Sequence, residues 1–205
     1  MVVPATLLSL IIILKKLWQG CSSNRHNFIE ELFNFIASKT PSHNLAWDIG
    51  TGNGQAAKSL AKLYKDVIAT DKSPKQLEFA ANVPNVQYIC TNPKMSICEL
   101  EKKVGKKSSV DLVTIAQALH WFDDRLHFYK QVIKKPNGIA TWCYKLPNIN
   151  NSVDSVFNKY YNVQPDWEPT RKSVDDKYKT IDFPFEPICD NNNNVVHLVF
   201  QTYLE

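Results

Sequence analysis

LAWDIGTGNGQ, residues 45–55, is the stretch of the chain that decides the fold class. An apolar run of strand length leads into three glycines at alternate positions, and residues 55–64 then carry apolar side chains at helical spacing. The chain has only 6 glycines in 205 residues, so half of them stand in this one bend. Glycines between a strand and a helix let a ligand approach the backbone closely. We therefore expect residues 50–54 to form a ligand-binding loop.

Strand and helix patterns alternate on both sides of this loop. Parallel strands need crossover connections, so the alternation predicts an α/β fold with a doubly wound, mostly parallel sheet and helices on both faces. The expected strands are 45–49, 67–70, 86–90, 110–116 and 139–144, and the expected helices are 24–38, 55–64, 73–81, 98–104 and 125–135, the last ending at Pro136. Beyond residue 146 the pattern weakens to a helix at 153–161 and a strand at 195–203.

An acidic residue ends the second expected strand. Asp71 lies 17 residues after Gly54, a spacing that suits a carboxylate accepting the ribose hydroxyls of a nucleoside. A second acid, Asp48, precedes the glycines, where its charge would disfavour a nearby pyrophosphate and favour a ligand with an ammonium and a sulfonium. This order, D-x-G-x-G-x-G, differs from the G-x-G-x-x-G of dinucleotide folds, so an NAD-linked oxidoreductase is disfavoured.

Two motifs connect the chain to a known family. DIGTGNGQ, residues 48–55, resembles motif I of the class I S-adenosylmethionine-dependent methyltransferases, which have a Rossmann-like sheet. VDLVTIAQALHWFD, residues 110–123, is similar to the fourth-strand motif of the methyltransferase type 11 group, and more closely to the plant and fungal branch related to trans-aconitate methyltransferase. The resemblance covers about residues 28–187. It implies S-adenosylmethionine as cofactor and a small molecule as methyl acceptor, with a carboxylic acid as one candidate.

The resemblance also implies cofactor contacts by position. Gly50, Gly52 and Gly54 would line the methionine end of the cofactor, and Asp48 would steer its ammonium through the loop.

Further contacts are implied at the ends of the next strands. Asp71 would hold the ribose, and Thr91, which follows the expected strand at 86–90, would flank the adenine. Gln117 and Ala118 would lie beneath the reactive sulfonium.

His120 is the candidate catalytic base, because the free imidazole titrates near neutral pH. The alternative is that His120 and Trp121 form part of the pocket wall or orient the following loop. A carboxylate acceptor would need no base, whereas a hydroxyl or amine could need one, so both roles stay open.

We expect the chain to consist of three parts: an apolar N-terminal segment at 1–22, a cofactor-binding core at 23–148, and a partial C-terminal substrate or cap region at 149–205. Residues 2–14 are apolar but too few to span a bilayer, which needs about 20 residues. We expect either a helix packed on the domain or a membrane-associating segment. The Lys15-Lys16 pair would favour a cytosolic body in the second case, and a cytoplasmic protein is the first expectation.

Composition excludes several classes of protein. Charge (24 basic, 20 acidic) is too balanced for a nucleic-acid binder, and 44% hydrophobic residues exclude wholesale disorder. The five cysteines form no C-x-x-C pair and no metal-ligand spacing with histidine, so no metal site is expected. Compared with the family pattern, little length remains for a C-terminal sheet edge, so the strand at 139–144 could be left open. A non-catalytic methyltransferase-like protein is therefore the alternative function. The oligomeric state cannot be inferred.

Overall fold

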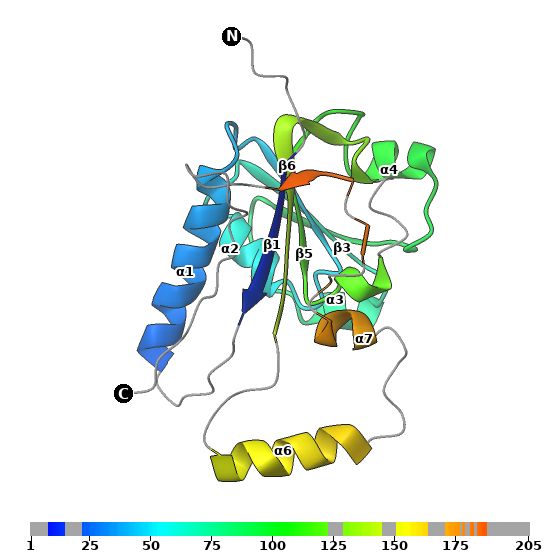
Figure 1. The fold of residues 1–205 in the computed structure, drawn as a ribbon. Coiled ribbons are helices and arrows are strands. Elements are labelled where there is room, and N and C mark those ends of the chain that lie inside the picture. The colour runs from blue at the N-terminus through cyan, green and yellow to red at the C-terminus, as the bar shows by residue number, and fades with distance from the viewer. Residues whose placement is uncertain are drawn as a thin grey trace.

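The computed structural model describes residues 8–14, 22–122, 129–144, 151–163, 171–176, 178, 181–182 and 184–187. Within them the chain forms one sheet of seven strands in the order β4-β3-β2-β5-β6-β1-β7, and all the recorded strand pairs are parallel (Figure 1). The strands are β1 (Leu8–Leu14), β2 (Leu45–Ile49), β3 (Asp66–Asp71), β4 (Val86–Cys90), β5 (Val110–Ala116), β6 (Ile133–Tyr144) and β7 (Glu186–Pro187).

Helices lie on both faces of this sheet, as the doubly wound fold class predicts. Buried side chains of α1 and α2 share a core cluster with Ala46 of β2, whereas Leu100 of α4 shares the other cluster with Trp47. Figure 1 shows α1 and α2 together on one side of the sheet. The helical elements are α1 (Ser22–Ser38), α2 (Gln55–Leu60), α3 (Pro74–Glu78), α4 (Ile97–Lys103), the 3₁₀ turn η1 (Leu119–Trp121), α6 (Asn151–Val163) and α7 (Arg171–Asp175).

The central strands are apolar on both sides because both sides are covered. Trp47 and Ile49 of β2 face one core cluster, and Ala46, the residue before Trp47, faces the other. In β5, Val113 and Ile115 join the first cluster and Leu112 joins the second. This burial on two faces fixes the register of the strands, because a slip of one residue would exchange the two sets of side chains. The carboxyl ends of β2 and β3 are thereby held side by side.

The expected helix at 125–135 is wrong at its C-terminal end. Strand β6 begins at Ile133 and runs through Pro136, and residues 123–128 lie outside the described part of the chain. Val110 pairs with Ile133 but Leu112 already pairs with Gly138, so a bulge holds Pro136 out of the ladder. A proline is tolerated in a strand at such a point because its missing N–H is not needed there.

The N-terminal apolar run is a strand where it is described, so the expectation of a packed helix is wrong for residues 8–14. β1 pairs in parallel with β6 over seven register positions, from Leu8 opposite Gly138 to Leu14 opposite Tyr144. It also pairs with β7 at two positions. The open edge expected beside residues 139–144 is therefore not present, because β6 has β5 on one side and β1 on the other.

At the other end of the chain, the expected helix at 153–161 is confirmed by α6, whereas the expected strand at 195–203 lies outside the described residues. Helix α7 packs against η1 after β5. In the described part of the chain, the helices are too short or too polar to cross a membrane. The division at residues 22 and 148 and the membrane association of residues 2–14 stay predictions.

Candidate functional site

The glycine loop is left-handed at three positions. Gly50, Gly52 and Gly54 have φ angles of 65°, 58° and 80°, which other residues adopt only with strain. A Cβ on Gly50 would lie 2.7 Å from the Cβ of Ala118, so this glycine allows close packing of the segment after β5. A Cβ on Gly54 would lie 2.5 Å from Tyr88 Oη. These two glycines are therefore required by the packing of the loop against its neighbours.

Gly52 differs because its open side faces no close neighbour. A Cβ on Gly52 would meet only the side-chain oxygen of Gln76, at 3.9 Å. The middle of the loop thus exposes its backbone to space that a ligand can enter, as expected for a glycine that serves close approach.

Asp71 is held against this open position. The backbone amide of Gly52 donates to Asp71 Oδ2 at 2.8 Å, and the amide of Ser73 donates to Oδ1 at 2.8 Å. A carboxylate oxygen has two lone pairs, so each oxygen can still accept one more hydrogen bond. The end of β3 therefore presents a fixed acceptor pair beside the open centre of the loop.

A small, partly open pocket lies at the carboxyl ends of β2 and β3. Such crevices outside the carboxyl ends of strands are where open α/β sheets bind ligands. Of the predicted site residues, the pocket brings together Gly50, Asp71 and Thr91. The remaining lining residues are Trp47, Ile49, Thr70, Lys72, Pro93, Met95, Phe122 and Tyr129. One end of the pocket is thus a carboxylate, and most of the remaining wall is aromatic or aliphatic.

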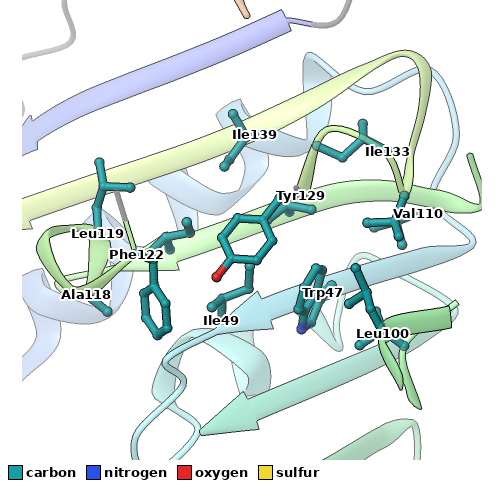
Figure 2. Close-up of a cluster of buried hydrophobic side chains, with 14 of the residues drawn as sticks. Trp47, Ile49, Leu100, Val110, Ala118, Leu119, Phe122, Tyr129, Ile133 and Ile139 are labelled. Atoms are coloured by element: carbon teal, nitrogen blue, oxygen red, sulfur yellow. The ribbon is translucent and has the colours of Figure 1, made fainter. Parts of the chain in front are cut away.

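Aromatic rings form much of that wall. Figure 2 shows Tyr129 between Phe122 and Trp47, above Ile49 at the end of β2. The rings of Trp47 and Tyr129 meet edge to face with centroids 5.2 Å apart, and those of Phe122 and Tyr129 are 6.4 Å apart. Edge-to-face contacts fix ring orientation. The three rings are buried and pack on one another, so they form a rigid apolar part of the pocket lining.

Asp48 lies beneath the loop and outside the pocket lining. Its carboxylate is completely buried and accepts hydrogen bonds from Thr114 Oγ1 at 2.6 Å and Thr51 Oγ1 at 2.5 Å. Burial raises the pKa of Asp48 to about 6, although these hydroxyls lower it in part. Asp48 thus joins the loop to β5. It could act on a ligand only electrostatically, through its charge, and not by direct contact. Its steering role stays a prediction.

The residues after β5 divide between packing and other roles. Ala118 is buried against Gly50, whereas Gln117 does not line the pocket. His120 lies on η1, outside the pocket lining, and its Nδ1 is 3.4 Å from the hydroxyl of the buried Tyr178. The structure therefore places His120 beside the C-terminal segment, and neither the base role nor the wall role is decided.

A family comparison matches this part of the chain. Residues 47–141 match the model described as a methyltransferase domain. These residues include the glycine loop, Asp71, the aromatic wall and the turn that follows β5.

Residues 47–141 thus have the sequence pattern of a methyltransferase domain.

Individual proteins agree with this assignment. The chain is 36% identical over 170 residues to a Dictyostelium discoideum protein that carries the name of a methyltransferase; the match covers 79% of this chain and 62% of that relative's length. A solved structure from Anaeromyxobacter dehalogenans, described as a type II methyltransferase, is 31% identical with a TM-score of 0.64, covering 78% of this chain and 66% of the other. A Methanococcus maripaludis protein described as S-adenosyl-L-methionine-dependent shares the fold at 17% identity, with a TM-score of 0.51 and coverages of 78% and 76%. The fold is that of the class I methyltransferases.

Two wall residues of the methyltransferase domain were missed as site residues from sequence. Tyr129 falls in a stretch that reads as an ordinary amphipathic helix, and Phe122 reads as the tail of the β5 motif. Trp47 lies within the apolar run of β2, and it is completely buried while also lining the pocket. The one available signal was the aromatic spacing after residue 116, which does not distinguish a core from a pocket wall.

Proposed function

We propose that the chain transfers a methyl group from S-adenosylmethionine to a small-molecule acceptor, and that this acceptor is a carboxylic acid. The observation that carries the proposal is the Asp71 carboxylate, fixed on the amide of Gly52 at one end of an aromatic-walled pocket. The match spans 62% of the length of the Dictyostelium relative.

The pocket chemistry fits a charged nucleoside. The free lone pairs of Asp71 suit the two hydroxyls of a ribose, which are both donors. Thr91, Met95 and Tyr129 line the pocket with it, offering a polar edge and apolar surface to an adenine ring. Buried Asp48 places a negative charge under the loop, which favours a cationic ligand end there.

When bound, S-adenosylmethionine supplies a methyl group already activated by a sulfonium, and the acceptor oxygen bonds to it as the sulfur–carbon bond breaks and its electron pair stays on sulfur. The protein's task is therefore chiefly alignment, which contributes about 7–11 kcal/mol in favourable cases. A Cβ on Gly50 would lie 2.7 Å from the Cβ of Ala118, so the two residues are in close contact. The loop and the segment after β5 therefore form one rigid support. This support is what would orient the two reactants.

A carboxylate acceptor is compatible with the position of His120, whose Nδ1 is 3.4 Å from the Tyr178 hydroxyl and which lies outside the pocket lining. A carboxylate is nucleophilic without losing a proton, so it needs no base, whereas an alcohol would.

Isothermal titration calorimetry with S-adenosylhomocysteine tests the proposal. We expect binding at one site per chain, weakened about ten- to a hundredfold by Asp71→Ala, because two hydrogen bonds to a charged group are lost. Asp66→Ala, at the exposed amino end of the same strand, is the matched control and should leave the affinity unchanged. Failure of the folded wild-type chain to bind would contradict the proposal.

Turnover is measured separately, with S-adenosylmethionine labelled in the methyl group. Label should pass to an extractable ester when carboxylic acids are supplied. Binding without turnover across mono-, di- and tricarboxylic acids would favour the non-catalytic alternative instead.

A further inference from the structure

Gln117 has a strained backbone at the carboxyl end of the central strand β5. Its φ is 58°, a left-handed angle that costs a non-glycine residue about 1 kcal/mol or more. The strain is held by β6, because the Gln117 amide donates to the Trp142 carbonyl at 2.8 Å and Ala116 pairs with Trp142. Backbone strain of this kind persists only where surrounding structure imposes it, and it gathers at ligand sites.

The side chain of Gln117 carries a second, independent anomaly. Its Nε2 is buried and has no hydrogen-bond partner in the part of the chain that the structure describes. An unsatisfied buried donor costs about 1–3 kcal/mol, so it calls for an explanation in a native site. An apolar side chain of the same length would avoid this cost, and the amide is present nevertheless.

Gln117 lies next to the glycine loop. The next residue, Ala118, packs on Gly50, so Gln117 is one residue away from this contact. Gln117 itself does not line the pocket that contains Asp71 and Thr91, and its backbone bonds to β6, on the side of β5 away from β2. The donor therefore lies next to the cofactor pocket without forming part of it.

A positive charge lies beside the segment that follows Gln117. Trp121, four residues further on, is 45% exposed, and Lys72 Nζ lies 5.4 Å from its ring centroid. An amide N–H₂ donates to oxygen and cannot accept from an ammonium. We propose that the Gln117 side-chain amide donates a hydrogen bond to a carboxylate oxygen of the methyl acceptor, which makes Gln117 a specificity-determining residue. This inference rests on the proposed function.

The test compares Gln117→Met with wild type, and uses Gln87→Met, at an exposed position on β4, as the matched control. Methionine keeps the length of the side chain and removes the donor. The probes are octanoate, benzoate and citrate, with octylamine and benzylamine as amine counterparts, each titrated into chain saturated with S-adenosylhomocysteine. We expect at least one carboxylate to bind, and Gln117→Met to weaken it about ten- to a hundredfold. Affinity for S-adenosylhomocysteine should stay within about twofold.

The thermal stability of Gln117→Met without ligand distinguishes a binding role of the amide from a structural role, because the two roles predict opposite changes. Without ligand, Gln117→Met should be at least as stable as wild type, because an unsatisfied donor is replaced by an apolar group. A clear loss of stability would show that the amide has a structural role and would overturn the inference.

The binding outcomes separate the two proposals. If the folded chain fails to bind S-adenosylhomocysteine, the proposed function fails and this inference fails with it. If it binds S-adenosylhomocysteine but binds no carboxylate, binds amines in preference, or binds carboxylates equally well as Gln117→Met, only this inference is overturned. If Gln117→Met lost as much affinity for S-adenosylhomocysteine as for the carboxylate, the amide would be assigned to the cofactor and this inference would also be overturned.

Discussion

Replacing Asp48 by asparagine should change how the stability of the chain depends on pH. In the folded chain burial raises the pKa of Asp48 from 3.8 to about 6, so the folded state holds this proton more tightly than the unfolded state. The protonated carboxyl therefore contributes to the free energy of unfolding. This contribution is fully present below about pH 4 and is lost as the pH rises through 6. The amide of the Asp48→Asn variant cannot titrate, so that variant lacks this contribution.

The size of the effect follows from the shift. About two pKa units at 1.36 kcal/mol each give about 3 kcal/mol between pH 4 and pH 7. A little under half of that, about 1 kcal/mol, falls between pH 5 and pH 7. The carboxylate is completely buried, so solvent screening does not reduce the figure.

Urea unfolding at several pH values between 4 and 8 measures the difference. The free energy of unfolding of wild type minus that of Asp48→Asn should fall steadily as the pH rises to about 7 and then stay level. A flat difference for Asp48→Asn, or one that rises with pH, would refute the argument that burial raises the pKa of Asp48.

Three further outcomes follow from contacts around the sheet. Gly50→Ala should destabilise the chain by more than Gly52→Ala, because the new Cβ meets Ala118 at 2.7 Å in the first case and open space in the second; chemical denaturation should show about 1 kcal/mol for Gly52→Ala from backbone strain alone. Gly52→Ala should nevertheless weaken S-adenosylhomocysteine binding in calorimetry, since its side chain enters the ligand space, and unchanged affinity would contradict that placement. Asp111→Asn should remove a contribution to stability that is sensitive to acid. Burial raises the pKa of Asp111, but the Ser42 hydroxyl and the amides of Asn44 and Leu45 lower it by more. The contribution of Asp111 is therefore present at neutral pH and disappears as the pH falls below about 4, which acid titrations followed by circular dichroism would measure.

Much of the sheet was predictable because burial on two faces leaves a clear pattern. The expected strands at 45–49, 86–90 and 110–116 have the same bounds as β2, β4 and β5. The expected helix at 73–81 also begins at the N-cap of α3, because the capping hydroxyl of Ser73 and the first-turn proline Pro74 act locally.

The misses arose where distant partners decide the local structure. Residues 8–14 are an apolar run whose periodicity does not separate strand from helix, and only the free side of β6 makes them a strand. Pro136 reads as a helix stop, yet it lies in a strand because the bulge opposite Asp111 removes the need for its N–H. Neither the edge nor the bulge can be inferred from local sequence.

The site shows the same division. The glycines and Asp71 were found because their backbone and charge requirements are written in the sequence at fixed spacing. Tyr129 was not found, because its place in the pocket wall depends on how the segment before β6 returns over Trp47.

A crystal structure of the chain soaked with S-adenosylhomocysteine would test the central claim most directly, by measuring the distance from the Asp71 carboxylate to the ribose. We expect both ribose hydroxyls within about 3 Å of Asp71 oxygens, with the adenine against Tyr129 and Met95. Density for the nucleoside at any other place, with Asp71 still bonded only to Gly52 and Ser73, would contradict the account.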